Sequence, residues 1–114
     1  AQYEVNMSEH VLCLVTSSNL KQATDIARFL VQNKLAACVN LIDPIRSIYS
    51  WNDQIYDEKE ILMIIKTRRA LFEKMAIEVK KLHSYEVPEI ICFSVEKGLP
   101  EYLNWIDQNT INAG

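Results

Sequence analysis

Residues 36–67, AACVNLIDPIRSIYSWNDQIYDEKEILMIIKT, decide the fold of this chain. Residues 36–49 and 55–67 are rich in strand-forming side chains. Residues 50–54 (SWNDQ) between them predict a turn, because Asn and Asp tolerate a left-handed backbone. Pro44 cannot donate a ladder hydrogen bond, so it predicts a bulge or an edge within the first strand. Two strands of up to ~13 residues span roughly 40 Å at about 3.3 Å per residue. Because a small domain does not need that length, we expect the hairpin to project beyond its own sheet and to bury its tip in another subunit.

Shorter elements are predicted on both sides of the hairpin. Asn19, with Gln22 three residues later, predicts a capping-box-like helix start, and apolar residues then recur at helical spacing. The full set is a strand at 10–16, a helix from Asn19 to 33–34, the two hairpin strands, a helix at 68–83, a strand at 88–95 and a helix from Pro100. This order predicts an α+β fold, a ferredoxin-like sandwich whose four-stranded antiparallel sheet carries both main helices on one face.

The second face of that sheet has no cover in this prediction. Residues 61–65 (ILMII) and 90–95 (IICFSV) are apolar at successive positions, so both faces of their strands are apolar. Helices on one face leave the other exposed, and an exposed apolar face is typical of an interface. The long hairpin and the uncovered face therefore both predict self-association.

The composition excludes several function classes. The chain has 114 residues, two glycines and a formal net charge of −3. Its length fits a single domain, which we place at 10–114. A phosphate-binding loop needs several glycines. Gly98 is the single internal glycine, since the other is the last residue, Gly114, so P-loops and dinucleotide fingerprints are excluded. The acidic balance argues against nucleic acid as a partner, and no apolar run approaches the ~20 residues of a membrane span, which argues against a membrane partner.

The N-terminal residues and the cysteines predict a terminal extension, a cellular location and the redox state of the thiols. We expect residues 1–9 to be a flexible extension, of which 1–6 (AQYEVN) precede a start-like Met7 and resemble an addition to the domain. With no basic and apolar leader pattern, the predicted location is the cytoplasm. Cys13, Cys38 and Cys92 are far apart and lie in apolar stretches, which predicts reduced, buried side chains and no disulfide framework.

Several motifs in order along the chain resemble one known family. These are KLAACVNLI at 34–42, IYSW at 48–51, IIKT at 64–67, HSYEVPEI at 83–90 and YLNWI at 102–106. The chain resembles the CutA divalent-cation-tolerance family from about residue 10 to 110. It departs from the family at two corners. Asp53 stands where the turn commonly has glycine, and Ser84 stands where many members have proline.

The resemblance implies an assembly and a biological context. It implies a ferredoxin-like subunit in a homotrimer similar to the PII signalling proteins. It also implies a genetic link to tolerance of copper and other divalent metals, and no established catalytic activity. Within such a trimer we expect Trp51, with Tyr49 and Ile55, to lie in the subunit interface, because large aromatic side chains contribute most near interface centres.

Two candidate metal ligands lie in the stretch from residue 83 to 89, and a third lies on the first strand. Imidazole is the commonest metal ligand and suits copper, so His83 is the first candidate, with Glu89 as a carboxylate and Cys13 as a soft ligand for Cu⁺. In some relatives the metal site is attributed to a first-strand cysteine and a histidine pair, and here Val15 and Leu82 stand at two of those positions. The alternative is that His83 caps the end of its helix and interacts with the helix dipole.

A second candidate site is a cleft between subunits for a small anionic or metal ligand. Its predicted lining is Lys66, Tyr85, Glu86 and Glu89. Lys66 lies in a strand that is apolar on both sides, and an unpaired buried ammonium is costly, so we expect it to pair with Glu89.

Four functions follow from these features. The first is a cytoplasmic trimer that binds a divalent metal, with copper as the candidate cofactor; the alternative is a PII-like regulatory trimer with a small molecule between its subunits. An enzyme of the acylphosphatase type needs a phosphate-binding loop and an arginine after the first strand, and TSSN at 16–19 has neither. A nucleophilic pair of Cys13 or Cys92 with His83 stays open, although buried cysteines are usually inert. An RNA-binding sheet would need exposed aromatic side chains on its central strands.

Overall fold

The computed structural model describes residues 8–112 and contains four strands and three α-helices within them. In chain order these are β1 (His10–Ser17), α1 (Leu20–Gln32), β2 (Cys38–Trp51), β3 (Gln54–Arg68), a 3₁₀ turn (Arg69–Leu71), α2 (Phe72–Leu82), β4 (Ile90–Ser94) and α3 (Pro100–Gln108). The predicted flexible extension spans residues 1–9, and residues 1–7 of it lie outside the described residues. Ser8 and Glu9, its last two residues, accept hydrogen bonds through their carbonyl oxygens from the Arg69 side chain and backbone N–H.

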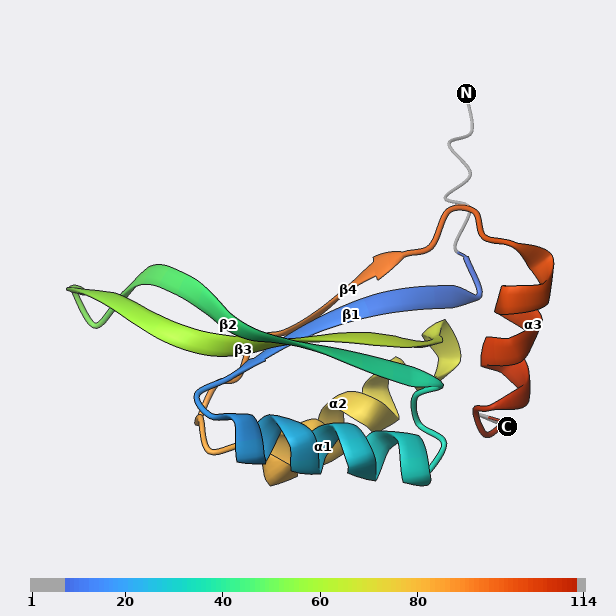
Figure 1. Cartoon of the computed structure of the whole chain (residues 1–114), viewed down its shortest axis with the longest axis horizontal. Helices are drawn as coiled ribbons and strands as arrows, with labels where there is room; N and C mark the ends of the chain where they lie inside the picture. The colour runs from blue at the N-terminus through green and yellow to red at the C-terminus, as the bar shows by residue number, and fades with distance from the viewer. Residues whose placement is uncertain (1–7, 113–114) are drawn as a thin grey trace.

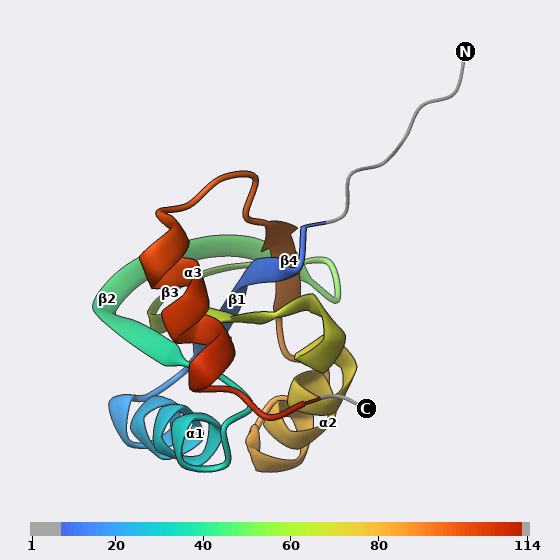
Figure 2. The ribbon, with the colours of Figure 1, turned by 90° about the vertical axis from the view of Figure 1, so that its right-hand side faces the viewer.

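The four strands form one antiparallel sheet in the order β2-β3-β1-β4. Helices α1 and α2 lie side by side against one face, and α3 lies at the end of the sheet away from the hairpin tip (Figures 1 and 2). The predicted ferredoxin-like α+β sandwich with a C-terminal helix is therefore confirmed.

The β2–β3 hairpin is long and its turn is tighter than predicted. Its strands pair from Cys38 opposite Lys66 to Trp51 opposite Gln54, so residues 50, 51 and 54 belong to the ladder. Only Asn52 and Asp53 form the turn, with φ of 51° and 62°. A two-residue hairpin turn with both central residues left-handed favours Asn, Asp and Gly, which explains how an aspartate holds a position where glycine is common.

Pro44 has the effect predicted for it. The register of β2 shifts between Ile42 and Ile45, which places a bulge around the proline. Beyond this bulge the hairpin leaves the helix-covered part of the sheet and extends freely (Figure 1). The Cα radius of gyration is accordingly 15.2 Å, whereas a compact chain of this length has about 13 Å.

Local signals place most helix ends. The Asn19 side chain accepts a hydrogen bond of 2.8 Å from the Gln22 backbone N–H, as the capping signal predicts. The Gln22 side chain does not complete the box; it donates to Ser17 Oγ and accepts from the Ser84 N–H. Helix α2 begins at Phe72 rather than at 68, because Arg68 still pairs with His10 in the sheet. Strand β4 is also shorter than predicted, at five residues.

The two faces of the sheet differ in their cover. The covered face packs on α1 and α2 and includes Val11, Cys13, Val15, Met63 and Ile65, all at most 1% exposed. Residues directly opposite on neighbouring strands point to the same side, so the alternate positions form the open face: Leu12, Leu14, Ile42, Leu62, Ile64, Lys66, Ile91 and Phe93. The predicted uncovered apolar face is therefore present in the single chain.

Candidate functional site

His83 links the end of α2 to the end of β1. Its ring is buried, and Nε2 lies 2.6 Å from the carbonyl oxygen of Thr16, which can only accept. Nδ1 lies 3.0 Å from the backbone N–H of Tyr85, which can only donate. These partners assign the neutral ring with its proton on Nε2. Both nitrogens are therefore occupied within the chain, and the ring connects β1 with the α2–β4 loop rather than binding the last carbonyls of α2.

Cys13 lies on the covered face, sealed beneath the helices. Burial, with a smaller contribution from Cys92, raises the pKa of the Cys13 thiol to about 12, so it carries a proton at neutral pH. Glu89 is exposed in the α2–β4 loop. Within residues 8–112 there is no group of three or more His, Cys, Asp and Glu side chains placed to hold a metal ion. The predicted metal ligands His83, Cys13 and Glu89 are therefore not assembled within one subunit.

Tyr85 forms a partly buried polar contact near the predicted cleft. Its hydroxyl donates a 2.9 Å hydrogen bond to Glu60 Oε2, and the Glu60 residue is 6% exposed. The Tyr85 ring also packs on the His83 ring, with centroids 4.7 Å apart. Burial, followed by the hydrogen bond to Glu60, raises the pKa of Tyr85 well above its ordinary value. Sequence reasoning missed Glu60; its signal was weak, a carboxylate directly before the apolar run 61–65.

Lys66 lies on the open face, far from this pair. Its Nζ sits 5.9 Å from the centre of the Tyr102 ring of α3, a cation–π contact. None of the ion pairs found among the described residues includes Lys66, so the predicted Lys66–Glu89 pair does not form within the chain. Six residues of β3 separate Lys66 from Glu60, roughly 20 Å in an extended strand. One subunit therefore does not bring Lys66 together with Tyr85, Glu86 and Glu89.

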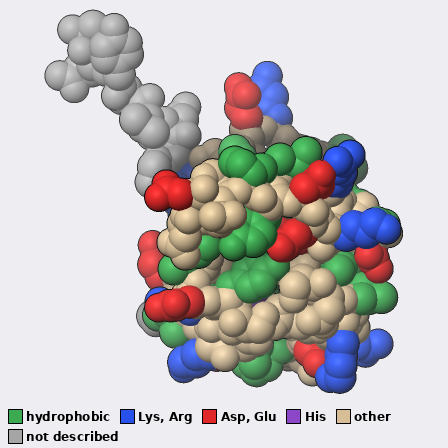
Figure 3. Space-filling model, turned by 90° about the vertical axis from the view of Figure 1, so that its left-hand side faces the viewer, with side chains coloured by type: hydrophobic (Ala, Val, Ile, Leu, Met, Phe, Trp, Pro, Cys, Tyr) green, Lys and Arg blue, Asp and Glu red, His purple; other side chains and the backbone are tan. Residues whose placement is uncertain are grey.

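Aromatic and acidic side chains line the hairpin. Tyr49 stacks on Tyr56 with centroids 5.3 Å apart and donates a 3.0 Å hydrogen bond to Glu58. Trp51 is 50% and Ile55 is 74% exposed near the tip. Figure 3 looks at the molecule from the tip, and hydrophobic side chains gather in the middle of this view, with most charged groups toward its rim. The predicted interface residues are therefore accessible in the single chain.

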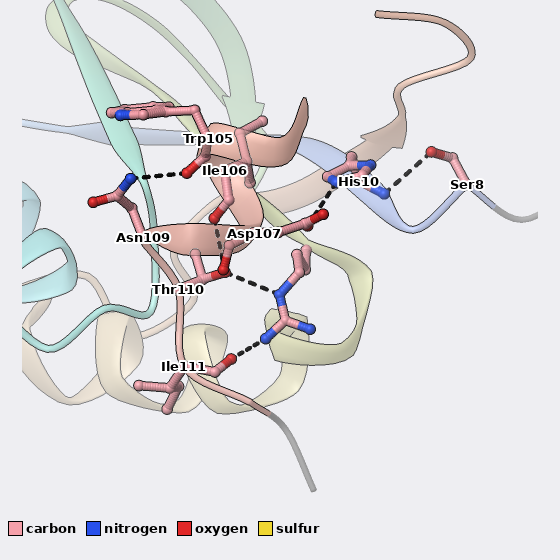
Figure 4. Close-up of polar contacts among 9 residues, drawn as sticks. Ser8, His10, Trp105, Ile106, Asp107, Asn109, Thr110 and Ile111 are labelled. Atoms are coloured by element: carbon pink, nitrogen blue, oxygen red, sulfur yellow. Dashed lines mark hydrogen bonds and ion pairs between the residues drawn. The ribbon is translucent and has the colours of Figure 1, made fainter. Parts of the chain in front are cut away.

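Helix α3 is held at the far end of the sheet by polar contacts (Figure 4). His10 Nε2 lies 2.8 Å from Asp107 Oδ1, which links β1 to the helix. The Arg68 side chain donates to Thr110 Oγ1 and to the carbonyl oxygen of Ile111. These contacts fix the Tyr102 ring beside Lys66 and cover that end of the open face.

Comparison with known proteins agrees with this architecture. The profile of a family described as CutA1 divalent ion tolerance protein matches residues 11–109. The chain belongs to this family. The Divalent-cation tolerance protein CutA of Thermus thermophilus is 41% identical over 104 residues, which cover 91% of this chain and 99% of the relative. Protein CutA of Mus musculus is 48% identical over 96 residues, 84% of this chain and 54% of the relative, so the chain spans about half of the mouse protein.

Solved CutA structures share the fold over nearly the whole chain. The Thermus thermophilus protein superimposes with a TM-score of 0.87 at 39% identity, covering 89% of this chain and 98% of that one. CutA1 of Shewanella sp. SIB1 gives a TM-score of 0.90 at 35% identity, covering 93% and 99%. The description of the family and the name of the Thermus thermophilus protein refer to tolerance of divalent cations and to no reaction. Within the described part of the chain, no helix is long and apolar enough to cross a membrane.

Proposed function

We propose that this CutA protein acts in divalent-cation tolerance as a homotrimer whose open sheet faces meet. The observation that supports this most directly is the exposure of large apolar side chains on the two edge strands of that face, Ile42 of β2 at 44%, and Ile91 and Phe93 of β4 at 47% and 53%. A contiguous apolar face of this kind is typical of an interface. The number three comes from the resemblance to the PII architecture, and the protruding hairpin with Trp51 supports contact with a neighbouring subunit.

The ligand in this proposal binds between subunits. Within one chain, both ring nitrogens of His83 are occupied and Cys13 is shielded from solvent, so neither is available to a ligand from outside without rearrangement. Glu86 and Glu89 lie in the α2–β4 loop, whereas Lys66 lies on β3. A second subunit is therefore needed to bring a lysine and these carboxylates into one site. Copper, as Cu²⁺ or Cu⁺, is the first ligand to test. The three free cysteines agree with the proposed reducing, cytoplasmic location.

The assembly is tested by placing a charge on each side of the molecule. Phe93→Asp puts a carboxylate on the open face, and we expect light scattering to report a single chain instead of three. Ile77→Asp is the matched control, because Ile77 is 57% exposed on α2, away from that face. We expect the control to remain trimeric. A Phe93→Asp trimer, or equal dissociation of both variants, would contradict the proposal.

Metal binding is tested by titrating Cu²⁺, and Cu⁺ under reducing conditions, against the wild type and His83→Gln. Glutamine keeps a donor and an acceptor where the imidazole has them, which protects the fold. Because His83 serves the fold in our account, we expect indistinguishable isotherms. A loss of copper binding in His83→Gln, with the trimer intact, would restore His83 as a ligand.

The second candidate function is a PII-like regulatory trimer with a small molecule between its subunits. The partly buried Tyr85–Glu60 hydrogen bond favours it, since this pair offers hydrogen-bonding groups and belongs to no set of three metal-ligating side chains within the described residues. A ligand that binds the folded trimer raises its thermal midpoint by mass action. A metabolite screen that gives shifts where divalent metals give none would favour this function over metal binding.

A further inference from the structure

Two of the three cysteines face each other across neighbouring strands. Cys13 of β1 is directly opposite Cys92 of β4 in the antiparallel register. Directly opposite residues point to the same side of a sheet, here the covered face. The neighbouring Cys92 thiol adds to the effect of burial in raising the pKa of Cys13.

The type of strand pair fixes how close these cysteines are. The backbone N–H of Val95 donates a 3.0 Å hydrogen bond to the carbonyl oxygen of His10. His10 and Val95 are therefore a hydrogen-bonded pair, one position before Val11 opposite Ser94. Hydrogen-bonded and non-hydrogen-bonded pairs alternate, so Cys13 and Cys92 form a non-hydrogen-bonded pair with Cα atoms about 4.5 Å apart. Disulfides span Cα separations of about 4.4–6.8 Å.

Accessibility differs between the two thiols. Cys13 is completely buried, whereas Cys92 lies on the edge strand β4 and is partly exposed. Oxidants can therefore reach Cys92 first, with Cys13 beside it. Cys38 is opposite Lys66 and points to the open face, so it lies on the other side of the sheet from this pair. Cys92 is thus accessible and the adjacent Cys13 can react with it, whereas Cys38, also partly exposed, is separated from both by the sheet.

We propose that Cys13 and Cys92 form a cross-strand disulfide when a hydroperoxide oxidises Cys92. The Cys92 sulfur attacks the O–O bond of hydrogen peroxide, which gives a sulfenic acid and one water. The Cys13 sulfur then attacks the Cys92 sulfur; the S–O bond breaks, and the departing hydroxide takes the Cys13 proton as a second water. The two sulfurs lose two electrons in total and the peroxide gains them.

The bond would clamp an edge strand to the centre of the sheet. Strand β4 has five residues and pairs only with β1 among the described strands. A bond between Cys13 and Cys92 closes a long loop, and long loops give the largest entropic stabilisation of the folded state. The cysteines face away from the proposed subunit interface, so this inference does not depend on the trimer.

The test exposes the folded, full-length protein to limiting hydrogen peroxide and then alkylates free thiols in denaturant. We expect only Cys38 to be alkylated, the mass to fall by two hydrogen atoms before alkylation, and peptide mapping to link Cys13 to Cys92. Reductant should restore both thiols, and the oxidised protein should unfold at a higher temperature. Cys38→Ser should form the Cys13–Cys92 disulfide as the wild type does and then contain no thiol that can be alkylated.

The key variant is Cys92→Ala, which changes a partly exposed side chain and leaves the buried Cys13 in place. We expect it to form no intramolecular disulfide under the same exposure. Protein oxidised in denaturant serves as the control for fold dependence, because there Cys38 should join in mixed links. Links from Cys38 in the folded protein, or a Cys92 that proceeds to sulfinic acid without bonding Cys13, would overturn the proposal.

Discussion

The covered and open faces of the sheet use the same kinds of side chain with different outcomes. On the covered face Cys13, Met63 and Ile65 are 0% exposed, whereas on the open face Ile91 and Phe93 remain about half exposed. Leu, Ile and Phe on the open face cannot be buried by the two short helices of this chain, which lie on the other side (Figure 2). Strand β3 therefore supplies one hydrophobic core within the subunit and, in our proposal, a second core between subunits.

The largest expected effect comes from truncating neighbouring isoleucines that point to opposite faces. Ile65→Ala leaves a cavity beneath the helices and should lower the free energy of unfolding by about 2–5 kcal/mol. Ile64→Ala, one residue earlier on the open face, should cost less in the fold and weaken association instead. Urea denaturation and light scattering at several protein concentrations separate the two effects. Equal losses of folding stability with unchanged association would break the comparison between the faces.

The next effect concerns the partly buried hydrogen bond between Tyr85 of the α2–β4 loop and Glu60 of β3. Tyr85→Phe removes the donor to Glu60 and leaves a nearly buried carboxylate oxygen without that partner, which should cost about 1–3 kcal/mol. Tyr56→Phe is the control, because Tyr56 lies on the hairpin and stacks on Tyr49 without a role at this contact. Thermal or urea unfolding at neutral pH measures both. Equal, small effects would show that the Tyr85 hydrogen bond is not a stabilising contact.

The same tyrosine gives a pH dependence with a definite sign. The pKa of Tyr85 is raised in the folded state, so above the ordinary tyrosine pKa of about 10 the folded protein binds more protons than the unfolded chain. Its stabilising contribution is present below that pH and is lost as the pH rises further. We expect the unfolding free energy of the wild type to fall more steeply between neutral and alkaline pH than that of Tyr85→Phe. Parallel curves would contradict the raised pKa.

Local and distant contacts explain what the sequence could predict. The Asn19 cap, the bulge at Pro44 and the open apolar face were predictable, because each depends on residues a few positions apart or on strand alternation. His83 does stand at the C-cap position of α2, as one alternative predicted, but its ring partner could not be predicted because Thr16 is 67 residues away in the chain. Glu60 was missed for the same reason, since Tyr85 lies 25 residues later. Proximity between distant polar groups arises from the register of the sheet, which the spacing of motifs does not encode.

A smaller effect is expected from the N-cap of α1, one of the two helices that cover the sheet. Asn19→Ala removes the cap that accepts from the Gln22 N–H, which should cost about 0.5–2 kcal/mol. Ser18→Ala is the control next to it, at an exposed position before the helix. Circular dichroism during urea unfolding measures both variants. A loss in Asn19→Ala no larger than in Ser18→Ala would show that the packing of α1, rather than its cap, determines its stability.

The smallest expected effect concerns an ion pair on the part of the hairpin that projects beyond the bulge at Pro44. Arg46 Nε and Nη2 donate to the two carboxylate oxygens of Asp57 at 2.8 and 2.6 Å, and both side chains are largely exposed. Arg46 lowers the pKa of Asp57, so this pair stabilises the fold above the ordinary aspartate pKa and its contribution is lost as the pH falls. Water and salt screen such exposed pairs, so Asp57→Asn should change the thermal midpoint at neutral pH less than Asn19→Ala does. A larger change that persists in high salt would mean that the pair is desolvated, and a neighbouring subunit resting on the hairpin would be the direct explanation.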